Sequence, residues 1–182
     1  MAEKSARLIS LDAFLGLTIA AMILANNPGS WDHVYWPLRH AAWHGWTPTD
    51  LIFPFFLFIV GVAIPLALGR RKDEGIRAVD LIAKIVSRAV IIFSLGLFLN
   101  LVPKFNLATL RIPGVLQRIA ICYLIAALLY LKGNWRVRAT AAVLLMAVYG
   151  LAMKLIPVPG YGAGDLSLAG NLCGYKLYHQ ST

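Results

Sequence analysis

Five long apolar stretches divide this chain, and each is about the length that crosses a membrane. They cover residues 8–25, 51–68, 83–102, 115–131 and 137–156. A bilayer core of about 30 Å needs roughly 20 apolar residues in a helix, which satisfies its own backbone groups in lipid. A composition of 59% hydrophobic and 14% charged residues excludes a soluble globular domain. We therefore predict an all-α, polytopic bundle of about five transmembrane helices, forming one domain over residues 1–182.

The basic residues predict the orientation of this bundle. Of the 17 Lys and Arg residues, 11 lie before the first stretch, or in the connections from the second to the third and from the fourth to the fifth and the adjoining ends of those stretches. The other side of the membrane would hold six: Arg39, Lys104, Arg111, Arg118, Lys154 and Lys176. Because positive residues favour the cytoplasmic side, we expect a cytoplasmic N-terminus and an outward-facing loop at 26–50. This clustering at helix ends explains the net charge of +9, so we expect no nucleic-acid partner.

The loop at 26–50 carries four of the five Trp and three of the four His. Trp residues are typical of the membrane interface, and stacking on a sugar ring is the alternative interpretation. His40 and His44 are four residues apart, which in a helix would place both on one face. No Glu follows the first histidine and no third ligand has a suitable spacing, so we expect no metal. A histidine at a wet membrane boundary suits acid–base chemistry, and an interfacial hydrogen-bonding role is the alternative.

Three further charged residues stand at the ends of the apolar stretches. The segment Thr47-Pro48-Thr49-Asp50 offers a hydroxyl cap, a first-turn proline and a carboxylate at the third position, so it predicts a helix start. Asp50 would thus be a capping residue, or would bind a protonated histidine or a substrate amine. Asp12 lies one turn into the first stretch, where Arg7 or a basic residue of the second loop would pair with it. Arg118 would either extend to the interface or bind an anion.

Four motifs in order resemble the heparan-alpha-glucosaminide N-acetyltransferase family and its bacterial relatives. They are SLDAFLGLTIAAMILANNPG (10–29), HAAWHGWTPTDLIFPFFLFIVG (40–61), RIPGVLQRIAICY (111–123) and VPGYGAGDLSLAGNL (158–172). The resemblance implies a transmembrane acyltransferase that takes acetyl from cytosolic acetyl-CoA and delivers it to the amine of a glucosamine-type sugar across the membrane. It also implies that His40 is the catalytic histidine and Asn26 its companion.

The chain departs from the family pattern at two points. Leu15 stands where the family usually has an arginine, which removes a cation near Asp12. Family members also have more spans, so we expect this chain to be the N-terminal half of a longer fold, with a polar, Gly-rich loop or tail at 157–182. Both departures predict reduced activity, or none, in the isolated chain.

Two other functions fit the same residues. A small ion- or proton-coupled transporter would use Asp12, His40 and Asp50 as a relay, and a non-catalytic membrane fragment would use none of them. For the acyltransferase we expect the lipid bilayer, acetyl-CoA and an amino-sugar acceptor as partners. The expected location is the cytoplasmic (inner) membrane if the source is bacterial, with the His/Trp loop on the outer side.

Overall fold

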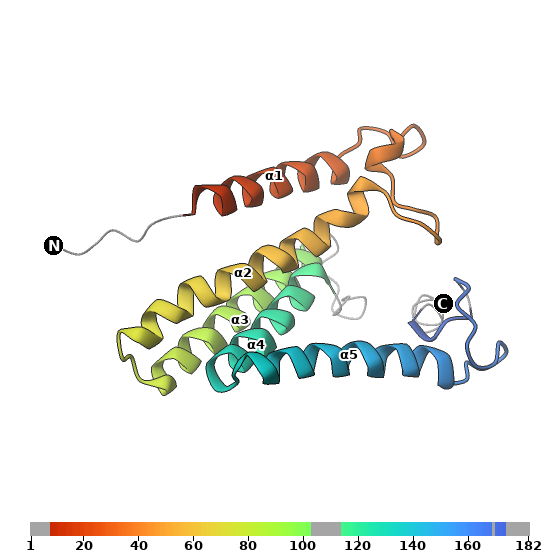
Figure 1. Cartoon of the computed structure of the whole chain (residues 1–182). Helices are drawn as coiled ribbons and strands as arrows, with labels where there is room; N and C mark the ends of the chain where they lie inside the picture. The colour runs from red at the N-terminus through yellow and green to blue at the C-terminus, as the bar shows by residue number, and fades with distance from the viewer. Residues whose placement is uncertain (1–7, 103–113, 169, 174–182) are drawn as a thin grey trace. The chain divides into compact units, whose positions relative to one another are not determined.

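The computed structural model describes residues 8–102, 114–168 and 170–173, and their regular structure is helical (Figure 1). The helices are α1 (Ile9–Asn26), η1 (Trp36–Leu38), η2 (Pro48–Leu51), α2 (Ile52–Asp73), α3 (Ala78–Leu101), α4 (Val115–Lys132) and α5 (Trp135–Leu155), where η marks a 3₁₀ turn. Within this part of the chain no β-strand forms, and the five α-helices, the second together with its 3₁₀ turn, are each long and apolar enough to cross a membrane. The predicted all-α architecture is confirmed.

Some residues used in the sequence analysis lie outside the described ranges. They are Arg7, Lys104, Arg111 and Lys176, together with the end of the 157–182 tail.

Two helices extend further into charged sequence than their apolar stretches predicted. The second continues to Asp73 and carries three basic residues in its last turn, where they stabilise the negative end of the helix dipole. The third begins at Ala78 rather than 83, and Asp80 in its first turn accepts a 3.0 Å hydrogen bond from Arg77 Nε. Hydropathy alone did not predict these turns because they contain charged residues, which are stable at helix ends but lower the mean hydropathy.

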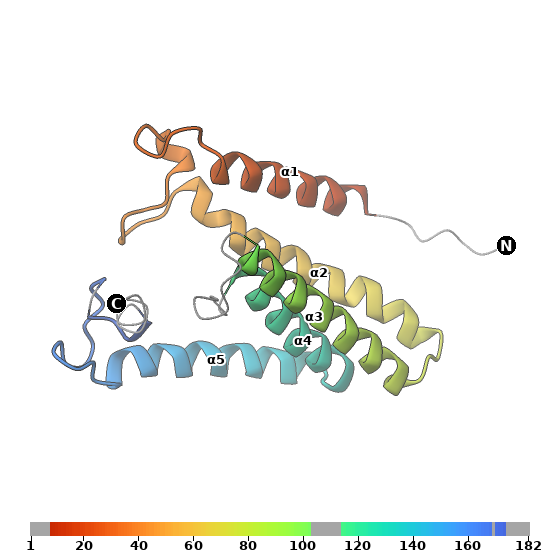
Figure 2. The ribbon, with the colours of Figure 1, turned by 180° about the vertical axis from the view of Figure 1, so that it is seen from behind.

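The chain divides into two compact units, Met1–Lys132 and Gly133–Thr182, and each is described by itself. The core of the first unit lies between α2, α3 and α4. It is made of Ile64, Leu68, Ile85 and Ala127. Helices α3 and α4 make the most extensive contact in this unit (Figure 2). Small residues allow this approach: a Cβ atom added at Gly96 of α3 would lie only 2.8 Å from the Cβ atom of Leu116.

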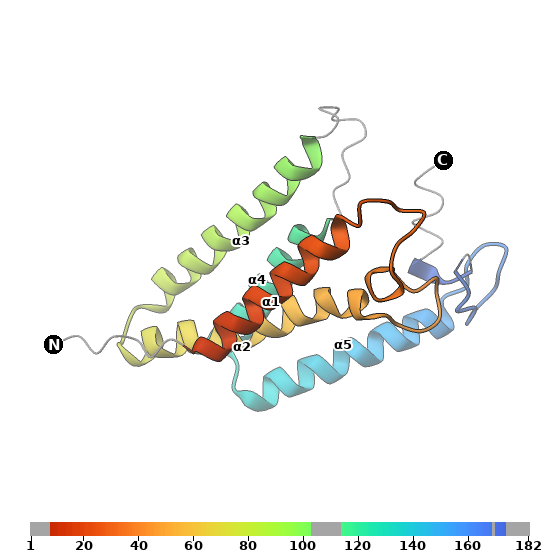
Figure 3. The same ribbon diagram turned by 90° about the horizontal axis from the view of Figure 1, so that it is seen from above.

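Helix α1 packs beside α2 (Figure 3). The ring of Phe14 meets Phe55 and Phe58 edge to face, with centroids 5.2 and 6.5 Å apart. On the outside of the unit, large apolar side chains such as Leu17, Ile23 and Phe98 are exposed. An apolar exterior over helices of this length is suited to lipid.

The second unit consists of α5 and a turn-rich segment that follows it. Asn134 caps α5, with its side-chain oxygen accepting from Val137 N at 3.0 Å. Residues 157–168 form turns and bends with one isolated bridge, between Val158 and Gly162. Asn171 is buried there and donates a 2.6 Å hydrogen bond to Ser167 O.

Candidate functional site

The site begins at the start of the second membrane span. Thr47 is the N-cap of η2, Pro48 is its first residue, and Asp50 completes a capping box by accepting from Thr47 N at 2.9 Å. The predicted helix start is confirmed. Because η2 continues directly into α2, the capping residues also fix where the loop at 26–50 enters the span.

The Asp50 carboxylate holds the loop as well as the helix. Its Oδ1 atom lies 2.6 Å from Nδ1 of His40. Its Oδ2 atom accepts from Ala41 N at 3.2 Å and lies 2.9 Å from Oγ1 of Thr47. Several donors converging on one carboxylate stabilise its charged form. Asp50 therefore caps the helix and also contacts the ring of a histidine.

This contact determines the chemistry available to His40. A charged carboxylate only accepts hydrogen bonds, so Nδ1 of His40 must donate to it. In the neutral ring Nε2 then has the free lone pair and is the atom that can take a proton. The His40 side chain is 71% exposed and that of Asp50 29% exposed, so the pair lies at the boundary between loop and solvent.

Thr47 makes a second connection that sequence reasoning missed. Its hydroxyl oxygen lies 2.7 Å from the carbonyl oxygen of Arg39 and 2.9 Å from Asp50 Oδ2. With its hydroxyl donating to Arg39 and its backbone N–H to Asp50, Thr47 ties the residue before His40 to the carboxylate that orients the His40 ring. The sequence showed Thr47 as a cap, but its long-range acceptor depends on the path of the loop.

A cavity of about 610 Å³ lies beside this network. Its polar wall is formed by Asn26 at the end of α1, His40 of the loop and Thr49 of η2. Apolar residues of α1 to α4, including Phe53 and Phe56, form the rest. The structure thus brings Asn26 and His40, which lie 14 residues apart in the sequence, to the wall of one cavity.

Three other predicted residues lie away from this cavity. His44 and Arg118 are exposed and do not line it. Asp12 lines a different cavity of about 640 Å³ with Arg70 and Asp73, where the start of α1 meets the end of α2.

The spacing of His40 and His44 does not place them on a shared helical face. Residues 40–47 form an irregular loop, and Gly45 within it has a φ of 101°, which ends any helical path. His44 instead meets the ring of Trp43 edge to face, with centroids 6.4 Å apart. Across the residues that the structure describes, no three His, Cys, Asp or Glu side chains are placed to hold a metal ion.

Comparisons with known proteins show which family this chain is similar to. The family model for heparan-alpha-glucosaminide N-acetyltransferase, catalytic, matches residues 7–163. The heparan-alpha-glucosaminide N-acetyltransferase of Mus musculus is 36% identical over 128 residues, which cover 68% of this chain and 19% of that protein. The protein of the same name from Homo sapiens is 36% identical over 130 residues, covering 69% and 19%. The matched part of this chain therefore spans about a fifth of the length of these curated relatives.

Proposed function

Because this chain belongs to the heparan-alpha-glucosaminide N-acetyltransferase family, we propose that it transfers an acetyl group from acetyl-CoA to the amine of a glucosamine-type sugar. The observation that carries this proposal is the oriented His40–Asp50 pair on the wall of the cavity that Asn26 also lines. A base and an amide donor beside an apolar cavity can together carry out acyl transfer from a thioester.

In the proposed reaction the sugar amine attacks the thioester carbonyl of the donor. Nε2 of His40 takes the proton that the amine loses as its nitrogen–carbon bond forms. The carbon–sulfur bond then breaks, and the thiolate leaves with the electron pair and is protonated. Asn26 donates its side-chain N–H to the oxyanion that develops on the carbonyl oxygen. Asp50 keeps the His40 ring in the tautomer that accepts at Nε2.

A second route uses the same residues in two steps. Nε2 of His40 attacks the thioester carbonyl first, and the carbon–sulfur bond breaks as the thiolate leaves. The sugar amine then attacks the acetyl-imidazole, the bond from the acetyl carbon to Nε2 breaks, and Nε2 takes the proton that the amine loses. Incubating the protein with acetyl-CoA alone distinguishes the routes. Mass spectrometry would find an added acetyl group on His40 in the two-step route and an unmodified residue in direct transfer.

The apolar wall of the cavity supports the choice of donor. A thioester and the alkyl part of its carrier are accommodated by apolar side chains, which also exclude the water that would hydrolyse them. In the proposed orientation the His40 end of this cavity faces outward and the Asp12 end of α1 faces the cytoplasm, so the donor enters from the Asp12 side. The acceptor reaches His40 from the exposed loop.

Proteoliposomes containing the full chain test this proposal. We expect transfer of label from radiolabelled acetyl-CoA to glucosamine, with a rate reduced by about 10²–10⁴ in His40→Ala and about 10²–10³ in Asn26→Ala. His44→Ala is the matched control, because His44 lies in the same loop but not on the cavity wall. A parental rate in His40→Ala would contradict the proposal. Ion flux without acetyl transfer would favour the transporter interpretation instead.

A further inference from the structure

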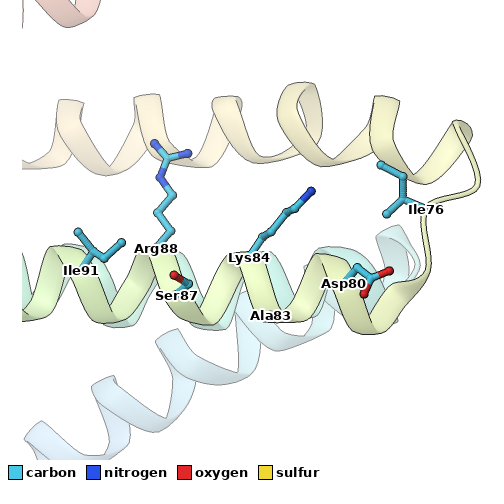
Figure 4. Close-up of a pocket in the computed structure, with 7 residues that line it drawn as sticks. All are labelled: Ile76, Asp80, Ala83, Lys84, Ser87, Arg88 and Ile91. Atoms are coloured by element: carbon cyan, nitrogen blue, oxygen red, sulfur yellow. The ribbon is translucent and has the colours of Figure 1, made fainter.

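A groove near the α2–α3 turn gathers two cations of α3. It has a volume of about 660 Å³, and its polar lining consists of Asp80, Lys84, Ser87 and Arg88 (Figure 4). Lys84 and Arg88 are four residues apart in the helix, so their Cβ atoms are roughly 5–6 Å apart on one face. Figure 4 shows both side chains extending from the same side of α3.

The charges of these two cations are not neutralised within the groove. Its one carboxylate, Asp80, already accepts from Nε and Nη2 of Arg77 at 3.0 and 3.3 Å. The Arg88 guanidinium lies over the ring of Tyr123 at 5.4 Å, a contact that leaves its N–H edges available. No salt bridge joins Lys84 or Arg88 to a carboxylate in the described part of the chain. Two cations within a membrane helix are costly unless an anion joins them.

The depth of the pair fits a phosphate at the edge of the bilayer. With a rise of 1.5 Å per residue, Lys84 and Arg88 lie about 2 and about 8 Å along α3 from residue 83, where its apolar stretch begins. Figure 4 shows the Lys84 side chain leaning toward the N-terminal end of α3, closer to the headgroup level, whereas that of Arg88 extends across the helix axis. An ammonium, a guanidinium and the Ser87 hydroxyl together supply the donors that a phosphate oxygen accepts from.

We propose that Lys84, Ser87 and Arg88 form a binding site for a phosphate ester. The phosphate comes either from a lipid headgroup or from the donor acetyl-CoA, and the second source rests on the proposed function. Shared lining residues favour the donor. Arg88 also lines an inner cavity of about 80 Å³ together with Ile119, and Ile119 in turn lines the cavity of His40. A donor whose phosphates bind at the groove would direct its thioester toward His40.

Binding measurements on the full chain in phosphatidylcholine nanodiscs test the donor source without requiring turnover. The probes are coenzyme A and pantetheine, which has the same thiol arm but lacks the phosphates and the adenosine. We expect Lys84→Gln/Arg88→Gln to weaken coenzyme A binding by about tenfold or more, with pantetheine binding unchanged. Arg71→Gln/Lys72→Gln is the matched control, since it removes the same charge from the last turn of α2 outside the groove.

A second arm tests the lipid source. We compare the thermal unfolding of the parent and of both double variants in phosphatidylglycerol and phosphatidylcholine nanodiscs. Stabilisation of the parent by the anionic lipid, lost only in the groove variant, would identify the lipid as the occupant. Arg88→Lys keeps a cation above Tyr123 and provides a folded variant if the double substitution disrupts packing; it should retain part of the binding.

Selective loss in either arm supports the phosphate site. Equal losses of binding or of stabilisation in the two double variants would show a general effect of surface charge and would overturn the proposal. No loss in either arm would show that Lys84 and Arg88 do not bind phosphate, which would also overturn it. The proposed function fails separately. A protein that binds coenzyme A through the groove but transfers no acetyl group would contradict the enzyme and leave the site intact.

Discussion

Replacing Asp50 by Asn tests whether the carboxylate sets the tautomer of His40. The variant keeps the size of the side chain but replaces one oxygen by an NH₂ group. In the structure Oδ2 faces two backbone N–H groups, those of Ala41 and Thr47, while Oδ1 faces Nδ1 of His40. The amide oxygen is expected to take the Oδ2 position, because the NH₂ group cannot accept from either backbone donor. The NH₂ group then points at His40.

This arrangement reverses the hydrogen bond to the histidine. Nδ1 of His40 must now accept from the amide, so its proton moves to Nε2 and the lone pair that would take the proton of the amine is lost. The same substitution in the Asp of a serine-protease triad, where the tautomer also becomes wrong, lowers kcat by about 10⁴. We expect a fall of about 10³–10⁴ here. Unfolding should change little, since the amide oxygen keeps the cap, with a loss of about 1 kcal/mol at most.

Two measurements check this prediction. The first is the initial rate of acetyl transfer to glucosamine in proteoliposomes, and the second is the ¹⁵N NMR spectrum of histidine-labelled protein, which identifies the protonated ring nitrogen. Asp165→Asn is the matched control because its carboxylate also accepts from a backbone N–H, that of Ser167 at 2.8 Å, in the turn after α5. The reasoning is refuted if the Asp50 variant keeps its proton on Nδ1, or if its rate falls no more than that of the control.

Two further substitutions have expected outcomes that follow from close contacts in the structure. Thr47→Val should lower kcat by about tenfold because it releases the Arg39 carbonyl, and Thr47→Ser, which keeps the hydroxyl, should restore the rate. The control Thr18→Val loses an equally short 2.7 Å hydrogen bond from a hydroxyl in α1 and should leave the transfer rate unchanged. Equal effects of the two valine substitutions would show that the Thr47 hydroxyl has a purely structural role. Gly96→Ala should destabilise the protein by about 1–3 kcal/mol in thermal unfolding in detergent, because its new Cβ overlaps α4. Gly61→Ala, with open space around the new atom, should not, and a parental melting temperature in the Gly96 variant would contradict the packing.

The helices were predictable because membrane spans depend on length and hydrophobicity, both of which are local properties of the sequence. The start of the second span was equally local: a hydroxyl, a proline and a carboxylate at fixed spacing define a cap wherever they occur. The charged ends of α2 and α3 were missed because an apolar stretch ends at the first charged residues. The helix continues beyond them because these charges interact favourably with the helix dipole and with neighbouring side chains.

The site itself was only partly predictable, because it depends on the path of an irregular loop. Reasoning from the residues alone ranked His40 and His44 equally. They differ because the loop brings His40 back to Asp50, ten residues later, and turns His44 toward Trp43. No spacing rule connects a histidine and a carboxylate across a segment without regular structure, and the family resemblance selected His40 without giving its partner. The cavity shared with Asn26 required the packing of α1 on α2.

The position of Asp12 helps to decide between acetyl transfer and a proton relay. A relay through Asp12, His40 and Asp50 needs groups that exchange protons over hydrogen-bond distances. Asp12 lies 14 residues before Asn26 in α1, which places it about 21 Å from the end of the helix that reaches the His40 cavity. The two residues line separate cavities, and the His40 cavity is walled mainly by apolar side chains. This separation is too long for direct proton transfer between Asp12 and His40, which weighs against a relay through these residues.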